Sequence, residues 1–354
     1  MDNNNSNTSL LSRAECNALR GLAIIGIFLH NYCHWLGPIV KENEYTFSQH
    51  NVDWLQQVLY SADALLPVHL ISFFGHYGVP VFLFLSAYGL EQKYGREEKK
   101  VAPLNFVKYH YLKLFKMMVA GFIAFTMIDA ITPGRFHYNV LEIVAQMFMF
   151  NNLLPNPDDV IWPGPYWYFG LMLQIYIVYR AFIYKRHWGF TLALIVICSA
   201  AQAFCAPESA ELNWLRYNCV GGILPFGMGI FIARFCHVAH KKNVYLGMFL
   251  ASTLLIYLCS MDYASWYVVP ILICVASISL VKILPQTING WLEWMGSISA
   301  ALFVCHPITR KIFIPISRHG DIYTGLLLYI IASIGVAWLF KQIISKIPNP
   351  KKIA

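Results

Sequence analysis

A histidine in the first long apolar segment is the residue best suited to chemistry. His30 stands ten positions after Arg20 in the run RGLAIIGIFLH. In a helix this separation is ~15 Å, which would put Arg20 at one membrane surface and His30 about halfway through the hydrocarbon. A titratable side chain at that depth is costly to bury and is a candidate functional residue. The imidazole could act as a general base or as a nucleophile, although a hydrogen bond to a neighbouring helix is a simpler explanation that stays open.

His34 follows His30 by one helical turn and lies on the same helix face. The two histidines could be ligands of one metal ion, but zinc sites use at least three protein ligands. No third ligand has a recognisable spacing in the sequence. We therefore expect no metal site.

A second deep histidine, His306, lies in the run GSISAALFVCHP over residues 296–307. The following Pro307 would kink the helix and free a carbonyl near the histidine. Two histidines at membrane depth favour a polar cavity inside the protein, where His306 could orient or polarise a substrate.

Basic side chains gather after the second apolar segment. Lys108, Lys113 and Lys116 recur within the run KYHYLKLFK. They could anchor the topology by snorkelling to the membrane surface. They could also form, with Arg20, a site for a polyanion such as a phosphate-bearing cofactor. The two interpretations are compatible.

The composition indicates a membrane protein. Of the 354 residues, 58% are hydrophobic and 12% are charged, whereas a soluble domain carries about 25% charged residues. The net charge of +8 comes from basic residues between apolar runs, which fits the positive-inside rule better than a nucleic-acid-binding surface. A spanning helix needs ~20 apolar residues. Ten segments are candidates, near residues 19–36, 69–90, 112–131, 165–184, 189–206, 218–236, 244–260, 265–283, 296–315 and 322–341.

The distribution of charge supports ten crossings. With ten, both termini and every basic cluster, including those with Lys99 and Lys352, lie on one side, which the positive-inside rule makes cytoplasmic. The run at 140–154 is shorter and more polar, so we expect it to re-enter or to lie in the interface. Counting it as a span would place Lys185 and Arg186 outside.

The predicted fold is therefore an all-α polytopic membrane protein with about ten transmembrane helices and cytoplasmic N- and C-termini. We expect a disordered tail at 1–12, a transmembrane domain at 13–345 and a basic cytoplasmic tail at 346–354. On the opposite side, Trp162, Tyr166 and Trp167 are typical of an outer interfacial aromatic belt.

At these motifs the chain resembles the bacterial type 3 acyltransferase family, integral membrane enzymes that mostly O-acylate surface carbohydrates. The resemblance rests on Arg20 with His30, on the run VPVFLFLSAYGL, on GSISAALFVCHP and on the tryptophan-led run that starts at Trp167. It covers residues 13–341 and includes the ten spans. Two features depart from the family. His110 and Lys113 stand where an Arg-x-x-Arg pair is common, and Gln174 lies near the position where many relatives carry a carboxylate.

The resemblance implies transfer of an acyl group, acetyl before others, from cytoplasmic acyl-CoA to a hydroxyl of a glycan or lipid-linked sugar. His30, Arg20 and His306 would be the catalytic residues, with His30 as base or acyl carrier. CoA phosphates would bind Arg20 and the three lysines Lys108, Lys113 and Lys116. His34 and the aromatic residues Trp162, Tyr166 and Trp167 would contact the acceptor.

The location implied is the bacterial cytoplasmic (inner) membrane, and the partners are acyl-CoA, the acceptor and membrane lipid, without nucleic acid. A secondary transporter or proton-coupled exporter that uses the buried histidines is the main alternative. Such a protein would usually show repeated halves with paired broken helices, and the sequence shows no such repeat.

Overall fold

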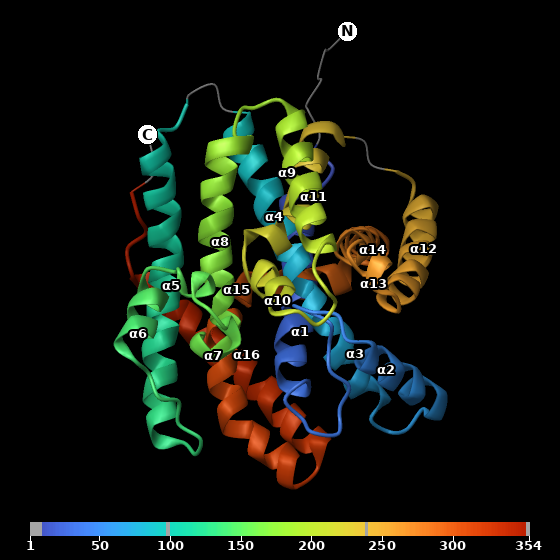
Figure 1. The fold of residues 1–354 in the computed structure, drawn as a ribbon, viewed down its shortest axis with the longest axis vertical. Helices are drawn as coiled ribbons and strands as arrows, with labels where there is room; N and C mark the ends of the chain where they lie inside the picture. The colour runs from blue at the N-terminus through green and yellow to red at the C-terminus, as the bar shows by residue number, and fades with distance from the viewer. Residues whose placement is uncertain (1–8, 97–99, 238–239, 352–354) are drawn as a thin grey trace.

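The computed structural model describes residues 9–96, 100–237 and 240–351, and every regular element in these ranges is a helix (Figure 1). Most of the predicted tail at 1–12, together with Lys99 and Lys352, therefore lies outside the described residues. The elements are α1 (Arg13–Cys33), α2 (Gln49–Ser61), α3 (Leu66–Phe74), η1 (Gly75–Tyr77), α4 (Gly78–Leu90), η2 (Glu91–Gly95), α5 (Pro103–Ile131), α6 (Val140–Met147), η3 (Asn151–Leu153), α7 (Pro157–Val160), η4 (Gly164–Tyr166), α8 (Trp167–Val178), η5 (Tyr179–Ile183), α9 (Trp188–Ala203), α10 (Ala210–Tyr217), α11 (Cys219–Phe235), α12 (Lys242–Ser260), α13 (Tyr263–Trp266), α14 (Val269–Ile283), α15 (Gln286–His319) and α16 (Ile322–Lys346).

Each of the ten predicted spans overlaps a helix, and the all-α prediction is confirmed for the described ranges. Within those ranges, five helical segments are long and apolar enough to cross a membrane, or six if the bent pair α10 and α11 is one span. α9 and α14 are apolar but shorter, and α1 is made more polar by Arg20, His30 and Asn31. The figure of about ten crossings thus stays a prediction.

The run at 140–154 folds as α6, a loop and η3 rather than as one long helix. The eight residues of α6 would rise ~12 Å, which is too short to cross the hydrocarbon. The capping box of Asn139 and Glu142 begins the helix, because each side chain accepts a hydrogen bond from the other residue's backbone N–H.

α1 lies at the centre of the bundle, where it packs against α15, α4, α3 and α14. Glycines allow the closest of these crossings. A Cβ on Gly21 would lie 1.9 Å from the Leu292 carbonyl oxygen, and one on Gly296 would lie 1.9 Å from the Asn17 carbonyl oxygen. Small residues that let backbones approach in this way are typical of membrane helix interfaces.

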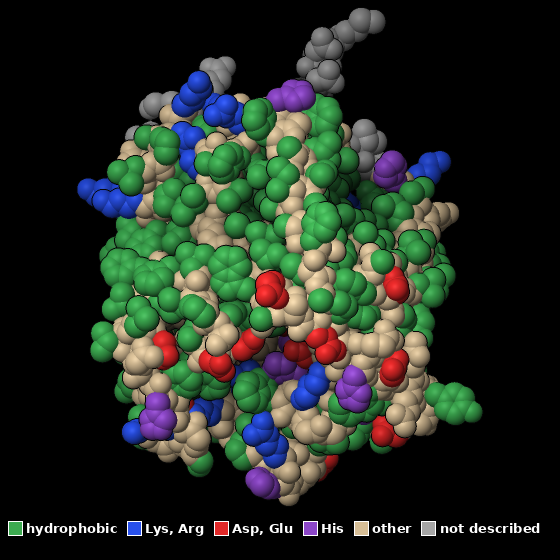
Figure 2. All heavy atoms as spheres, viewed as in Figure 1, with side chains coloured by type: hydrophobic (Ala, Val, Ile, Leu, Met, Phe, Trp, Pro, Cys, Tyr) green, Lys and Arg blue, Asp and Glu red, His purple; other side chains and the backbone are tan. Residues whose placement is uncertain are grey.

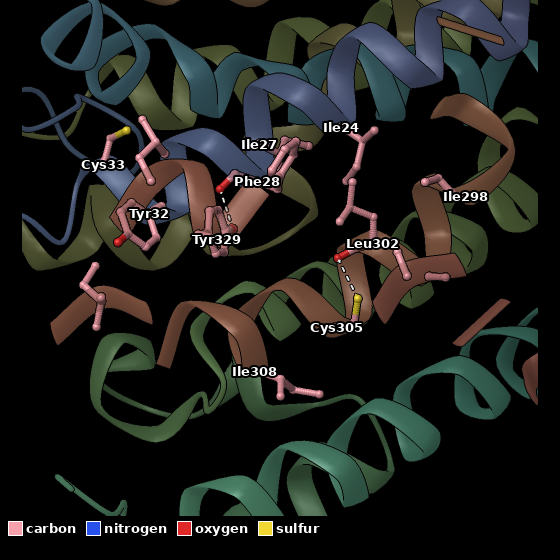
Figure 3. Packing of buried hydrophobic residues seen from close by; sticks show 14 of the residues in the cluster. Ile24, Ile27, Phe28, Tyr32, Cys33, Ile298, Leu302, Cys305, Ile308 and Tyr329 are labelled. Carbon is pink, nitrogen blue, oxygen red and sulfur yellow. Dashed lines mark hydrogen bonds between the residues drawn. The ribbon is translucent and has the colours of Figure 1, made fainter. Parts of the chain in front are cut away.

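The largest apolar cluster joins α1 to α15 and α16 (Figure 3). Ile24, Ile27 and Phe28 pack against Leu302 of α15, and all four are nearly inaccessible to solvent. The hydroxyl of Tyr329 in α16 donates to the Phe28 carbonyl oxygen at 2.7 Å. The helix that carries His30 is therefore held rigidly on this side.

Charged residues divide the molecule into two ends. The start of α5, the turn before α9 and the end of α11 lie together at the upper end of the bundle in Figure 1. Basic residues such as Lys108, Lys185 and Arg234 belong to these segments, and we call this the basic end. Figure 2 shows lysine and arginine side chains along this rim, an apolar band below it, and acidic side chains around a hollow further down.

Candidate active site

The His30 ring has a fixed orientation near the C-terminal end of α1. Its Nδ1 lies 2.7 Å from the carbonyl oxygen of Ser72 in α3, and His30 is 2% exposed. A carbonyl can only accept, so in the neutral ring Nδ1 carries the proton and Nε2 keeps its lone pair. The ring is thus poised to accept a proton at Nε2.

A break in the second apolar segment brings Ser72 to His30. α3 ends at Phe74, and the 3₁₀ turn η1 separates it from α4. A Cβ on Gly75 would lie 2.6 Å from the His30 Cβ and 2.7 Å from the Gly26 carbonyl oxygen. Only glycine therefore allows this turn to touch α1.

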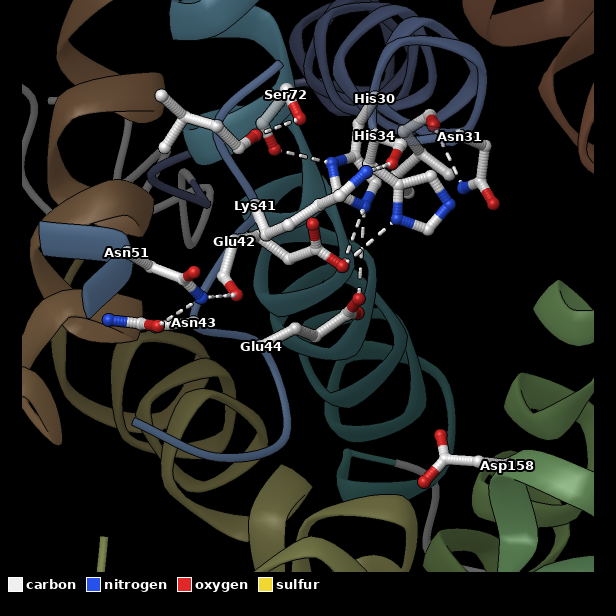
Figure 4. Close-up of polar contacts among 12 residues, drawn as sticks. His30, Asn31, His34, Lys41, Glu42, Asn43, Glu44, Asn51, Ser72 and Asp158 are labelled. Carbon is white, nitrogen blue, oxygen red and sulfur yellow. Dashed lines mark hydrogen bonds and ion pairs between the residues drawn. The ribbon is translucent and has the colours of Figure 1, made fainter. Parts of the chain in front are cut away.

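Two carboxylates lie on the lone-pair side of His30 (Figure 4). Its Nε2 is 3.8 Å from Glu42 Oε1 and 3.9 Å from Glu44 Oε2. Glu42 Oε1 is also 3.0 Å from Nδ1 of His34. A protonated His30 would be stabilised by a negative charge on Glu42.

The loop that carries the two carboxylates is fixed by hydrogen bonds from several elements. Ser72 Oγ donates to the Val40 carbonyl oxygen at 2.6 Å. The Glu42 carbonyl accepts from Asn51 Nδ2 at 3.1 Å, and the Glu44 carbonyl accepts from Arg216 Nε at 2.8 Å. The carboxylates are therefore placed by the fold and do not depend on a flexible loop.

The two carboxyls differ in charge. Burial opposes ionisation of Glu42, but His34 and His30 outweigh it and lower the pKa of this carboxyl below its usual range. Burial, and then the neighbouring Glu42 carboxylate, raise the pKa of the Glu44 carboxyl well above its usual range. The Glu42 carboxylate beside His30 is therefore negatively charged, while the Glu44 carboxyl readily holds a proton.

These groups face a cavity of about 260 Å³, which we call the histidine cavity. Asp158 lies across it from Glu44 (Figure 4), and the hydroxyl of Tyr217 donates to that aspartate. Aromatic walls and acidic groups together suit an uncharged polyhydroxyl ligand. The cavity is also lined by His34, Trp35, His76, Trp162, Trp167, Tyr168 and Arg310.

Four of the predicted site residues line the histidine cavity, namely His30, His34, Trp162 and Trp167. The Trp162 indole Nε1 is buried and has no hydrogen-bond partner in the described part of the chain. A buried donor without a partner is costly, and a ligand in the cavity would satisfy it.

The structure does not bring Tyr166 and His306 to this cavity. The Tyr166 hydroxyl donates to the Val304 carbonyl oxygen at 3.0 Å, so this side chain ties η4 to α15. His306 is fully buried, and its Nδ1 lies 3.1 Å from the Leu302 carbonyl oxygen one turn earlier. Neither residue is among those that line the cavity.

The predicted cofactor-binding residues lie in α1 and α5. Arg20 Nη1 donates to Asn17 Oδ1 at 2.8 Å. Lys108 and Lys113 are exposed, and the Lys113 ammonium lies 5.8 Å from the Tyr109 ring centre. Lys116 instead donates to the Ile347 carbonyl oxygen at 2.6 Å and to Asn349, so it holds the end of α16.

The two departures from the family pattern have structural roles. His110 is buried, with ring centres 4.4 Å from Phe106 and 4.3 Å from Tyr176. Gln174 accepts a hydrogen bond from the Cys219 backbone N–H at 2.9 Å and donates to Asn218. It therefore caps the start of α11, because the first N–H groups of a helix lack intrahelical partners.

A second cavity, of about 150 Å³, lies between α5 and the histidine cavity. We call it the apolar cavity, because Tyr168 and Ser299 supply the only hydroxyls among its lining residues. Leu114 and Met117 of α5 form one wall. The two cavities share Ile27, Val79, Tyr168 and Phe303 as lining residues. The two cavities are therefore neighbours.

Sequence reasoning did not identify Glu42, Glu44, His76 and Arg310 as site residues. Arg310 is 6% exposed, donates to the Asn31 carbonyl oxygen at 3.1 Å and lies 4.9 Å from the Trp35 ring centre. A buried arginine at a spanning depth is itself a functional signal. Glu42 and Glu44 follow the histidines on an irregular loop. Such a loop has no helix or strand periodicity that would predict which way a side chain points.

Comparison with known proteins identifies the family of the chain. A sequence model described as an acyltransferase domain matches residues 13–342. No curated protein and no solved structure matches the chain. The family match spans nearly the whole chain, including α1, both cavities and most of α16. The protein is a multi-pass membrane acyltransferase and belongs to the acyltransferase 3 family.

Proposed function

We propose that this acyltransferase moves an acyl group, in the simplest case acetyl, from cytoplasmic acyl-CoA to a hydroxyl of a glycan or lipid-linked sugar. The observation that carries the proposal is the order of sites along the bundle. A basic end is followed by the apolar cavity and then by the histidine cavity, where the His30 lone pair faces Glu42.

The donor would bind from the basic end. Arg20, Lys108 and Lys113 would contact the CoA phosphates, and lysines act there as point charges rather than as bidentate partners. The pantetheine arm and thioester would occupy the apolar cavity, whose α5 wall begins one residue after Lys113. The thioester would then reach the wall shared with the histidine cavity.

The acceptor would occupy the histidine cavity, which opens beside exposed side chains such as Asp158 and Trp35. Trp162 and Trp167 would stack on a sugar ring, as aromatic faces do with apolar ring surfaces. Carboxylates would accept hydrogen bonds from sugar hydroxyls. The opening would face the outside if the basic end is cytoplasmic.

In the chemical step, His30 Nε2 takes the proton of the acceptor hydroxyl while that oxygen attacks the thioester carbonyl carbon. The carbon–sulfur bond breaks, the thiolate of CoA takes the proton back from His30, and the products are an ester and free CoA. Glu42 stabilises the imidazolium formed on the way. General-base catalysis of this kind contributes typically ~10²–10⁴-fold.

An acyl-His30 intermediate is the second possible role of the same lone pair. Incubation of the purified protein with radiolabelled acetyl-CoA and no acceptor separates the roles. The base mechanism predicts no label on the protein chain, whereas labelled His30 in a peptide digest shows that the histidine carries the acyl group.

The test of the overall function is turnover of acetyl-CoA by the full chain in detergent, with His30→Ala and Arg20→Ala as variants and His50→Ala as the matched control. His50 is exposed on α2. We expect the first two variants to lose turnover while the control keeps it. Wild-type turnover in both variants, with native thermal stability, would contradict the proposal. If acetyl-CoA keeps its acyl group but the protein moves a solute across the membrane of proteoliposomes, a transporter would be favoured.

A further inference from the structure

The cluster beside His30 also has the chemistry of a transition-metal site. His30, His34 and Glu42 each offer a ligand atom, and the three atoms lie within 4.8 Å of one another. The sequence had supplied two ligands and no third. The fold supplies Glu42, because the loop after α1 folds back over the two histidines (Figure 4).

The spacing of these atoms is close to that of a zinc site. Tetrahedral Zn²⁺ with bonds of ~2.0–2.1 Å has neighbouring ligand atoms ~3.3 Å apart. Glu42 Oε1 lies 3.0 Å from His34 Nδ1 and 3.8 Å from His30 Nε2. Small side-chain movements would therefore close the site around an ion. Two imidazoles and one carboxylate form a ligand set that zinc uses with one position left open.

Groups around the cluster also support a metal site. His30 Nδ1 donates to the Ser72 carbonyl, which is the arrangement that orients a metal-bound histidine. His76 is 3% exposed, lines the same cavity, and has no hydrogen-bond partner at either ring nitrogen among the described residues. Its ring centre is 5.5 Å from that of His30. Buried nitrogens of this kind need a polar partner, and a ligand in the cavity would supply one.

We propose that His30, His34 and Glu42 bind one Zn²⁺ ion, and that the bound ion inhibits acyl transfer. The metal would occupy the Nε2 lone pair of His30, so the histidine could no longer accept the acceptor proton. The binding part needs only the cluster, whereas the inhibition part rests on the proposed function. Zinc would thus act as a reversible inhibitor that competes for the active histidine.

The experiment is a Zn²⁺ titration of the purified full chain in detergent against a chromophoric chelator, after treatment with EDTA. His34→Ala and Glu42→Gln test the ligands, and His50→Ala is the control for surface histidines. We expect the wild type and the control to bind one equivalent. The two ligand variants should bind at least about 10-fold more weakly, since even outer-shell changes cost ~10–100-fold.

Thermal melting of each variant shows whether it is folded, and Co²⁺ in place of Zn²⁺ gives visible absorption bands that report the ligand geometry. Wild-type affinity in both ligand variants, or an unchanged Co²⁺ spectrum in them, would overturn the site.

Inhibition is measured separately, as acyl-CoA turnover with Zn²⁺ and with EDTA. Tight binding without inhibition overturns the inhibitory role. Absence of turnover even in EDTA counts against the proposed function and leaves the metal site intact.

Discussion

At the scale of single residues, the partner of each charged or reactive side chain decides what that side chain can do. His30 keeps a free lone pair because Ser72 occupies its other nitrogen. Arg310 and Glu42 are buried or half-buried beside the same cavity. The reactive and charged side chains therefore lie together where the histidine cavity borders α1.

Glu42→Gln should lower kcat by about tenfold or more while leaving the fold intact. Opposite charges within ~4–6 Å stabilise each other, and Glu42 Oε1 lies 3.8 Å from His30 Nε2. Its removal therefore destabilises the imidazolium that forms when His30 takes the proton. The measurement is acyl transfer under saturating donor in the presence of EDTA. Glu208→Gln, at an exposed position, is the matched control and should keep the wild-type rate. An equal rate in both variants would show that Glu42 does not support the imidazolium.

Lys113→Ala and Lys116→Ala should have different effects although the two lysines are neighbours on α5. Lys113 is exposed and available for a phosphate, so its loss should raise the KM for acyl-CoA with kcat unchanged. Lys116 holds the end of α16, so its loss should lower the melting temperature and leave the KM alone. The assay is donor-dependent kinetics beside a thermal melt. A raised KM in the Lys116 variant would assign both lysines to the donor site.

At the scale of elements, the position of His30 depends on the contact between η1 and α1. Sequence analysis predicted the span near 69–90 but not its interruption at Gly75–Tyr77, because glycine and histidine in an apolar run do not by themselves indicate a 3₁₀ turn. The helix α15 begins at Gln286, ten residues before the predicted 296. Its first turns are amphipathic, and hydropathy alone does not detect such turns.

Gly75→Ala should destabilise the protein by ~1–3 kcal/mol, as overpacking does, and should also reduce acyl transfer. The new methyl group would collide with His30 and with the Gly26 carbonyl, so it would separate Ser72 from the imidazole. Gly89→Ala on α4 is the control, because its Cβ meets nothing within 4 Å. Thermal melts and turnover are the readouts. Equal melting temperatures and equal turnover in the two variants would refute the close contact between Gly75 and α1.

The site shows clearly what the sequence could and could not predict. The spacing of Arg20, His30 and His34 was predictable because helix geometry fixes it, while the roles of these residues stay predictions. Glu42 and Glu44 were not predictable, because their positions depend on Arg216, Asn51 and Ser72, which are distant in the sequence. The grouping of Glu42 with His30 and His34 was not predicted for the same reason.

At the scale of the whole molecule, both ends of the described chain lie towards the basic end of the bundle (Figure 1). From the sequence, ten crossings together with the distribution of charge grouped the termini with the basic clusters, and the side of the membrane stays a prediction. The number of crossings is harder to predict, because α1 carries the polar residues of the site and α9 and α14 are short.

The topology predicts opposite labelling of two positions by a membrane-impermeant maleimide. Cys236, which is exposed after α11, should react only after the membrane is permeabilised. A cysteine placed at His319, exposed at the end of α15, should react in intact cells. Both are tested in a background without the other cysteines. Labelling of Cys236 in intact cells would show that the basic end faces the outside, opposite to the proposed orientation.

The most direct test of the central claim compares two buried histidines. His30→Gln and His306→Gln are each measured for acyl transfer under saturating acetyl-CoA and EDTA, with thermal melts to confirm folding. His30 lines the cavity and His306 does not. We expect His30→Gln to lose about 100-fold or more in kcat, while His306→Gln stays within a few-fold of the wild type. A folded His30→Gln enzyme with wild-type kcat would show that His30 is not the catalytic base.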